Sequence, residues 1–165
     1  MSIYDELLYW VRESELFEFE PQMPGTLSLR RMFVSKHLHG APWHEGRYGL
    51  LRADLDRFTE GAMIPVRLPP SKSVKAYLAL LDETSGVWEI RSTKPEPQLR
   101  VFGFFPHMDT FLAVTWNERR ELDSDEEWQF ALKVCKREWQ RLFPAYVPLT
   151  GTNIHDYLSK QFLLL

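Results

Sequence analysis

With 165 residues, 44% of them hydrophobic and 14% aromatic, the chain is rich enough in apolar side chains to exclude intrinsic disorder and to build one domain with its own core. Its net charge of −3 argues against a protein held on nucleic acid by a general surplus of cations. No apolar run approaches the roughly 18 residues of a membrane span, and the N-terminus lacks the pattern of a signal peptide, so we expect a cytoplasmic protein that does not bind a membrane.

The N-terminal half is expected to contain three helices and one strand. Apolar spacing predicts a short helix over residues 3–11, followed by an extended arm that ends in the proline and glycine cluster at 21–25. Alternating side chains predict a strand over residues 27–34. Helical spacing then predicts one helix over residues 48–59 and another over 71–81, which begins after two prolines.

The middle of the C-terminal half is expected to form a meander. Residues 87–91, 99–105 and 110–116 each have the composition and alternation of a strand. The segments between them are too short for crossover connections. Neighbouring strands of this group should therefore be antiparallel.

A long amphipathic helix is predicted over residues 125–143, because Ser124 and Glu127 have the spacing of a capping box. Its apolar stripe should pack on the sheet and consists of Trp128, Leu132, Cys135 and Trp139. Since the only cysteine of the chain lies within this stripe, we expect a core thiol that is neither a nucleophile nor a disulfide partner. The tail should be a loop and a short helix that ends in exposed apolar residues at 162–165.

Charge is unevenly distributed along the chain. Residues 1–25 contain six acidic residues against Arg12 alone, whereas residues 26–105 contain twelve basic and eight acidic residues, and the remainder is acidic again. Such a pattern is most often ordinary scatter of surface charge. The sharper hypothesis is a basic centre across which the acidic N-terminal arm lies, holding the centre inactive.

Two phrases of the sequence carry a resemblance to a known family. They are Gly86-Val87-Trp88-Glu89-Ile90-Arg91 and Leu99-Arg100-Val101-Phe102-Gly103-Phe104-Phe105. Together with the predicted order of elements, they resemble the RelE/HigB-like toxin superfamily, in particular its phage-derived, HigB-type branch, over about residues 27–143. The resemblance implies an α+β, RelE-like fold whose elements follow the order strand, two helices and three-strand meander. Its small, mostly antiparallel sheet packs against the long C-terminal helix. Residues 1–165 would then form a single domain, with 1–25 as an acidic helix and arm, 27–143 as the RelE-like core and 145–165 as a tail.

The resemblance also implies a function in a toxin-antitoxin pair. Members of this family are metal-independent endoribonucleases that cleave mRNA, usually on the ribosome, and an antitoxin-like protein partner neutralises them. Attack of a ribose 2′-hydroxyl on the neighbouring phosphate needs a proton acceptor, cations that stabilise charge on phosphorus, and an acid for the leaving oxygen. No cofactor is expected.

The residues that fit these roles are four cations and one histidine. We expect the cations to converge on one phosphate in the meander, with the histidine as acid or base. The candidate catalytic residues are Arg91, Lys94, Arg100, Arg119 (or its neighbour Arg120) and His107. The ordinary alternative is that Arg91 and Arg100 pair with Glu89 or Glu96 and have a structural role.

Two other classes of function remain open. The first is a catalytically inactive RelE-like scaffold, which would bind a protein partner or a second copy of the chain through its aromatic residues, acidic arm and apolar termini. The second is a zinc-dependent hydrolase that uses His37, His39 and His44, the first two on one face of a strand. A polar strand end explains such histidine spacing more often than a metal site does.

Overall fold

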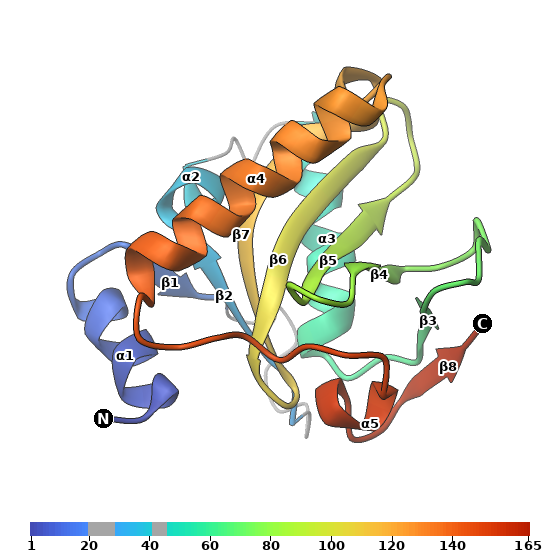
Figure 1. The fold of residues 1–165 in the computed structure, drawn as a ribbon. Helices are drawn as coiled ribbons and strands as arrows, with labels where there is room; N and C mark the ends of the chain where they lie inside the picture. Colours follow the sequence, from blue (N-terminus) through green and yellow to red (C-terminus); the bar gives the residue numbers. More distant parts are fainter. Residues whose placement is uncertain (20–28, 41–45) are drawn as a thin grey trace.

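The computed structural model describes residues 1–19, 29–40 and 46–165. At the centre of the protein lies a mixed sheet, which within the described residues has eight strands in the order β1-β2-β7-β6-β5-β4-β3-β8 (Figure 1). The strands are β1 (Leu16–Glu18), β2 (Arg31–Ser35), β3 (Ile64–Arg67), β4 (Leu78–Asp82), β5 (Val87–Ser92), β6 (Leu99–His107), β7 (Thr110–Glu118) and β8 (Phe162–Leu164). The helices are α1 (Ile3–Arg12), α2 (Lys36–His39), α3 (Gly46–Thr59), α4 (Asp125–Leu142) and α5 (Ile154–Tyr157), with a 3-10 turn, η1 (Arg119–Glu121).

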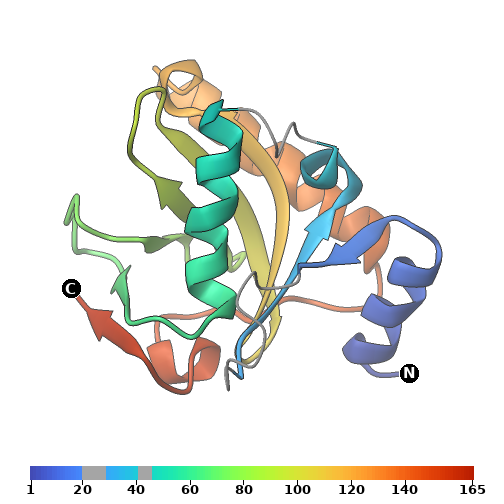
Figure 2. The same cartoon turned by 180° about the vertical axis from the view of Figure 1, so that it is seen from behind.

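A long helix lies on each face of the sheet, α4 on one side (Figure 1) and α3 on the other (Figure 2). On the α4 side, the buried rings of Phe102 and Phe104 pack in one core with Trp139. On the α3 side, Phe105 packs in a second core with Phe58. Because β6 is covered on both faces, its sequence is an almost continuous apolar run.

Several local predictions are confirmed. Strands β5, β6 and β7 form an antiparallel meander, and helices lie at the predicted positions near residues 3–11, 48–59 and 125–143. Ser124 caps α4, since its hydroxyl accepts a hydrogen bond from the Glu127 N–H at 3.2 Å. The Glu127 carboxylate accepts from the N–H of Asp123 at 3.0 Å, one residue earlier than in a regular capping box. Cys135 is fully buried, and burial raises its pKa to about 12.

The predicted RelE-like fold, with a small and mostly antiparallel sheet, is wrong, because the described residues form an eight-stranded mixed sheet with three parallel pairings. Residues 71–81 form a loop and strand β4, where a helix was expected. The tail contains the expected short helix as α5, but this helix ends at Tyr157 and the last residues form β8. β8 and β4 both pair with β3 in parallel. A strand that is buried on both faces has apolar residues at every position, so residues 76–80 also match a helical period.

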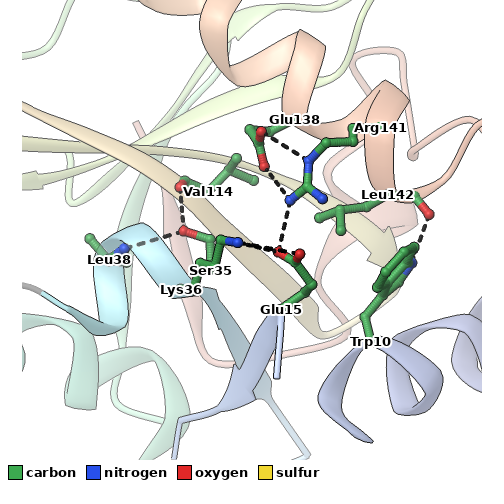
Figure 3. A network of polar contacts seen from close by, with 9 residues as sticks. All are labelled: Trp10, Glu15, Ser35, Lys36, Leu38, Val114, Glu138, Arg141 and Leu142. Atoms are coloured by element: carbon green, nitrogen blue, oxygen red, sulfur yellow. Dashed lines mark hydrogen bonds and ion pairs between the residues drawn. The ribbon is translucent and has the colours of Figure 1, made fainter. Parts of the chain in front are cut away.

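The N-terminal arm docks on the C-terminal end of α4 (Figure 3). The Glu15 carboxylate accepts hydrogen bonds from Arg141 at 2.9 Å and from Lys36 at 3.3 Å, and the Trp10 indole donates to the Leu142 carbonyl at 2.7 Å. The side chains of Leu7 and Leu16 are fully buried. The described part of the arm is therefore integrated into the fold, and the hypothesis that it lies across the basic centre is not supported for these residues.

Membrane insertion through a helix is not indicated by the described residues. None of the helices among residues 1–19, 29–40 and 46–165 has the length and apolar composition that a membrane crossing needs.

Candidate anion-binding site

Four arginines converge on one buried glutamate at the edge of the α4-covered face. They line a cavity of about 280 Å³, together with Leu81 and the indole of Trp128. We call this cavity the arginine recess and define it by Arg67, Glu89, Arg91, Arg100, Arg119 and Trp128. It combines three of the cations predicted from the sequence with residues that the sequence did not single out.

Sheet register explains why three of these side chains meet. Arg91 of β5 lies directly opposite Arg100 of β6, and residues that are opposite each other in an antiparallel pair point to the same face. Glu89 precedes Arg91 by two residues and so shares that face. The centre of the recess, made of Glu89, Arg91 and Arg100, is therefore a consequence of the local β5–β6 pairing.

Arg67 and Arg119 reach the same place from more distant elements. Arg67 of β3 is paired with Ala79 of β4, which is itself paired with Glu89. Since alanine has only a methyl group, the Arg67 side chain extends over it toward the glutamate. Arg119 is held at the start of β6, because its backbone N–H donates to the Gln98 carbonyl at 2.7 Å.

The charges in the recess are close together but loosely paired. Arg67, Arg91 and Arg100 each have one nitrogen 3.9, 3.8 and 3.7 Å, respectively, from a Glu89 carboxylate oxygen. These distances exceed those of a hydrogen bond. The Glu89 Oε2 atom and the Arg91 Nε atom are buried and have no hydrogen-bond partner among the described residues. Buried donors are normally satisfied, so Arg91 Nε can donate to a group that enters the recess.

Neutral groups hold the arginines in position without cancelling their charge. The carbonyls of Ser73 and Val74 accept hydrogen bonds from Arg67 and Arg91 at 3.0 and 3.1 Å. Arg119 donates to the Leu122 carbonyl at 2.9 Å, and its guanidinium lies 5.4 Å from the centre of the Trp128 ring. Four guanidinium groups around one carboxylate leave an excess of three positive charges.

Burial makes each charge in the recess costly. It lowers the pKa of Arg100 to about 10, so this arginine is still charged at neutral pH. Burial likewise lowers the pKa of Arg91. It raises the pKa of Glu89, and the arginines around it, Arg100 first, oppose that rise. An anion that entered the recess would offset the excess positive charge and accept the hydrogen bond that Arg91 Nε leaves unused.

The structure brings together three of the five predicted catalytic residues, Arg91, Arg100 and Arg119. Lys94 is exposed in the loop after β5 and does not line the recess. His107 follows Arg100 by seven residues at the other end of β6, roughly 23 Å away at the rise of an extended strand. Its ring packs against Tyr4, with 5.7 Å between the ring centres. The neighbouring Arg120 is exposed and paired with Glu118.

Sequence reasoning missed Arg67 and Trp128. It named Glu89 only in the alternative that Arg91 and Arg100 pair with a glutamate, and the structure places both arginines beside Glu89. Nothing in the sequence pointed to Arg67, because its position depends on parallel pairing with β4, and most of β4 lies in the segment expected to be helical.

The histidines do not form the arrangement that the zinc hypothesis requires. His37 and His39 belong to helix α2 and therefore do not share a strand face, and the His39 ring stacks on Phe17 with 3.8 Å between ring centres. His44 lies outside the described residues. Across residues 1–19, 29–40 and 46–165, no group of three or more histidine, cysteine, aspartate or glutamate side chains has a metal-binding arrangement.

Comparison of the chain with protein-family models, with curated proteins and with solved structures gives no match. The resemblance to the RelE/HigB superfamily therefore stays a prediction from two short phrases of sequence, and the function has to be inferred from the arginine recess.

Proposed function

We propose that the chain binds RNA and holds one backbone phosphate in the arginine recess. The observation that carries this proposal is the imbalance of charge around Glu89. Three guanidinium groups lie 3.7–3.9 Å from the carboxylate without a hydrogen bond to it, and that of Arg119 lines the same cavity. Arginine is well suited to phosphate, because its planar fork of N–H groups matches the spacing of phosphate oxygens. A phosphate in the recess would accept the hydrogen bond that Arg91 Nε leaves unused.

Exposed lysines beside the recess favour a polymer with several phosphates over a small anion. The loop between β3 and β4 supplies the two carbonyls that orient Arg67 and Arg91. The same loop carries Lys72 and Lys75, both exposed. Positive side chains outside the recess give further phosphates of a strand a place to bind, which is how most of the affinity for RNA arises.

RNA cleavage is a second proposal, and Glu89 is the residue that favours it. A carboxylate whose pKa is raised by burial, next to cations that stabilise charge on phosphorus, suits removal of the proton from a ribose 2′-hydroxyl. This proposal assigns proton transfer to Glu89 in place of the distant His107. Action on the ribosome and neutralisation by a partner protein belong to the same proposal.

The binding proposal is tested by fluorescence anisotropy with a labelled single-stranded RNA at low salt. We expect Arg119→Ala to weaken binding roughly tenfold or more, since a hydrogen bond between charged groups is typically worth 1.5–3 kcal/mol. Arg119→Lys, which keeps the charge but not the fork, should have an intermediate affinity. The matched control is Arg120→Ala, because Arg120 is the exposed neighbour and does not line the recess.

The same samples separate the competing functions. The slope of log affinity against log salt concentration should decrease by about one in Arg119→Ala and stay unchanged in Arg120→Ala. Electrophoresis of the RNA after incubation shows whether it is cut. If RNA binds equally well to both variants, the recess is not the binding site. If the wild type does not bind RNA at all, the alternative of a protein-binding module is preferred.

A further inference from the structure

A second cavity lies on the opposite flank of the N-terminal half of α4. It has a volume of about 520 Å³. It is lined by β7 residues 115–117, by His37 of α2, by Leu122 and apolar residues of α4, and by three glutamates. We call it the flank groove. The apolar residues that matter below are Phe130, Ala131 and Val134, and the glutamates are Glu121, Glu126 and Glu127.

The flank groove exists because one strand of the sheet ends early. β2 pairs with β7 only as far as Ala113, and at Ser35 the chain turns into α2. The Ser35 hydroxyl closes this pairing, since it donates to the Val114 carbonyl at 2.6 Å and accepts from the Leu38 N–H at 3.3 Å (Figure 3). β7 continues to Glu118, and β6 pairs with it to that end. Past Ala113, α4 therefore overhangs a part of β7 whose other edge has no strand beside it among the described residues.

The other end of the same flank shows what kind of segment this helix accepts. There the described part of the N-terminal arm covers α4, with Glu15 bound to Arg141 and the Trp10 indole bound to the Leu142 carbonyl (Figure 3). A segment that combines apolar and acidic side chains thus packs on the basic end of the flank. Apolar contact and opposite charge act together at this contact.

The bare end has the opposite charge. Phe130 is 64% exposed, an unusual position for a phenylalanine in the middle of a helix. The three glutamates of the flank groove are exposed, and no described lysine or arginine forms an ion pair with them. We propose that the flank groove docks a segment of a partner protein in which a bulky apolar side chain is flanked by lysine or arginine. The apolar side chain would lie against Phe130 and Val134, and the basic residues would face the glutamates.

The test uses two labelled peptides that differ only in charge. The first peptide contains leucine and lysine, spaced so that a helix has leucine on one face and lysine beside it. The second has glutamate in place of every lysine. Anisotropy should show binding of the lysine peptide to the full chain, and Phe130→Ser should weaken it on the order of tenfold. Glu126→Gln should weaken it less, roughly twofold to fivefold, because a charge at the rim of an interface contributes mainly to the rate of association.

Matched controls come from exposed residues elsewhere on the protein. Val147→Ser removes an apolar side chain that is 84% exposed, and Glu13→Gln removes an exposed charge. Both should leave peptide affinity unchanged, and Phe130→Ser should leave RNA affinity unchanged. Equal binding of the two peptides, equal effects of Phe130→Ser and Val147→Ser, or no binding of the lysine peptide would each overturn the docking proposal. None of these results bears on RNA binding by the arginine recess.

Discussion

Two carboxylates in this protein each lie among several cations, and they differ in how they are paired. Glu15 accepts hydrogen bonds from Arg141 and Lys36 at 2.9 and 3.3 Å, and these bonds, that of Arg141 first, lower its pKa. Glu89 has three arginine nitrogens at 3.7–3.9 Å without a hydrogen bond to them, and burial raises its pKa. The first cluster is closed and ties the N-terminal arm to α4. The second has one unused donor, Arg91 Nε, and excess positive charge, which favours the binding of an anion.

The largest expected effect sharpens this comparison at Glu89. Replacing Glu89 by glutamine removes the negative charge nearest the proposed phosphate, so Glu89→Gln should increase RNA affinity roughly tenfold, or about 1.4 kcal/mol. The measurement is anisotropy with the labelled RNA. If the chain also cleaves RNA with Glu89 as proton acceptor, the same variant should bind more tightly and not cut. A weaker affinity for RNA in Glu89→Gln would contradict the assignment of charge in the recess.

A pH series tests the same group without mutation. Burial raises the pKa of Glu89 above its usual value of 4.5. As the pH falls, this carboxylate is therefore protonated at a higher pH than an ordinary glutamate. Protonation removes a charge that repels phosphate, so wild-type affinity for RNA should increase between pH 7 and pH 5 by up to about tenfold. In Glu89→Gln the affinity should change much less over this interval. An equal pH dependence in the two proteins would show that another group titrates.

The closed cluster should affect stability and leave binding unchanged. Glu15→Gln replaces two ion pairs by weaker hydrogen bonds and should lower the free energy of unfolding by about 1 kcal/mol in a urea titration. Since the pKa of Glu15 is lowered in the folded protein, its contribution is present above pH 4.5 and is lost as the pH falls through the folded value. The stability difference from wild type should therefore shrink below pH 4.5, while RNA affinity at neutral pH stays the same. A loss of RNA binding would place the two clusters in one functional unit.

The smallest expected effect is at Arg120. This arginine is next to Arg119 in sequence, but its side chain is 75% exposed and paired with Glu118. Arg120→Ala should leave both the free energy of unfolding and the RNA affinity close to their wild-type values. A large effect on RNA affinity would move the binding surface out of the recess and onto the exposed 3-10 turn.

The sequence predicted the part of the site that depends on local pairing. Arg91 and Arg100 are cross-strand neighbours because a short connection joins β5 and β6. Antiparallel pairing across a short connection can be predicted from sequence. His107 was assigned to the site because it follows the same strand, but the strand continues from Arg100 for seven more residues and carries it to the other end of the sheet. Two residues of one strand belong to the same site only if few residues separate them, because an extended strand rises about 3.3 Å per residue.

The part of the fold that sequence reasoning did not predict depends on parallel pairing between distant segments. β3 pairs with β4 and with β8, which is almost one hundred residues further along the chain. No short-range pattern records such a contact, and the buried residues of β4 satisfied a helical period equally well. Arg67 depends on this pairing, so it was missed together with the strand that carries it.

The most direct test of the arginine recess is an NMR titration that follows the Nε–H signals of the arginine side chains. Inorganic phosphate and then the RNA are added to labelled full-length protein. The signals of Arg91 and Arg119 should shift and saturate, with the Arg91 signal moving downfield because its Nε–H gains the hydrogen-bond acceptor that it lacks. The signal of Arg141, which is already bound to Glu15 and Glu138, should stay in place. Shifts confined to Arg141 and Arg120, with the recess signals unchanged at saturating phosphate and RNA, would contradict the account.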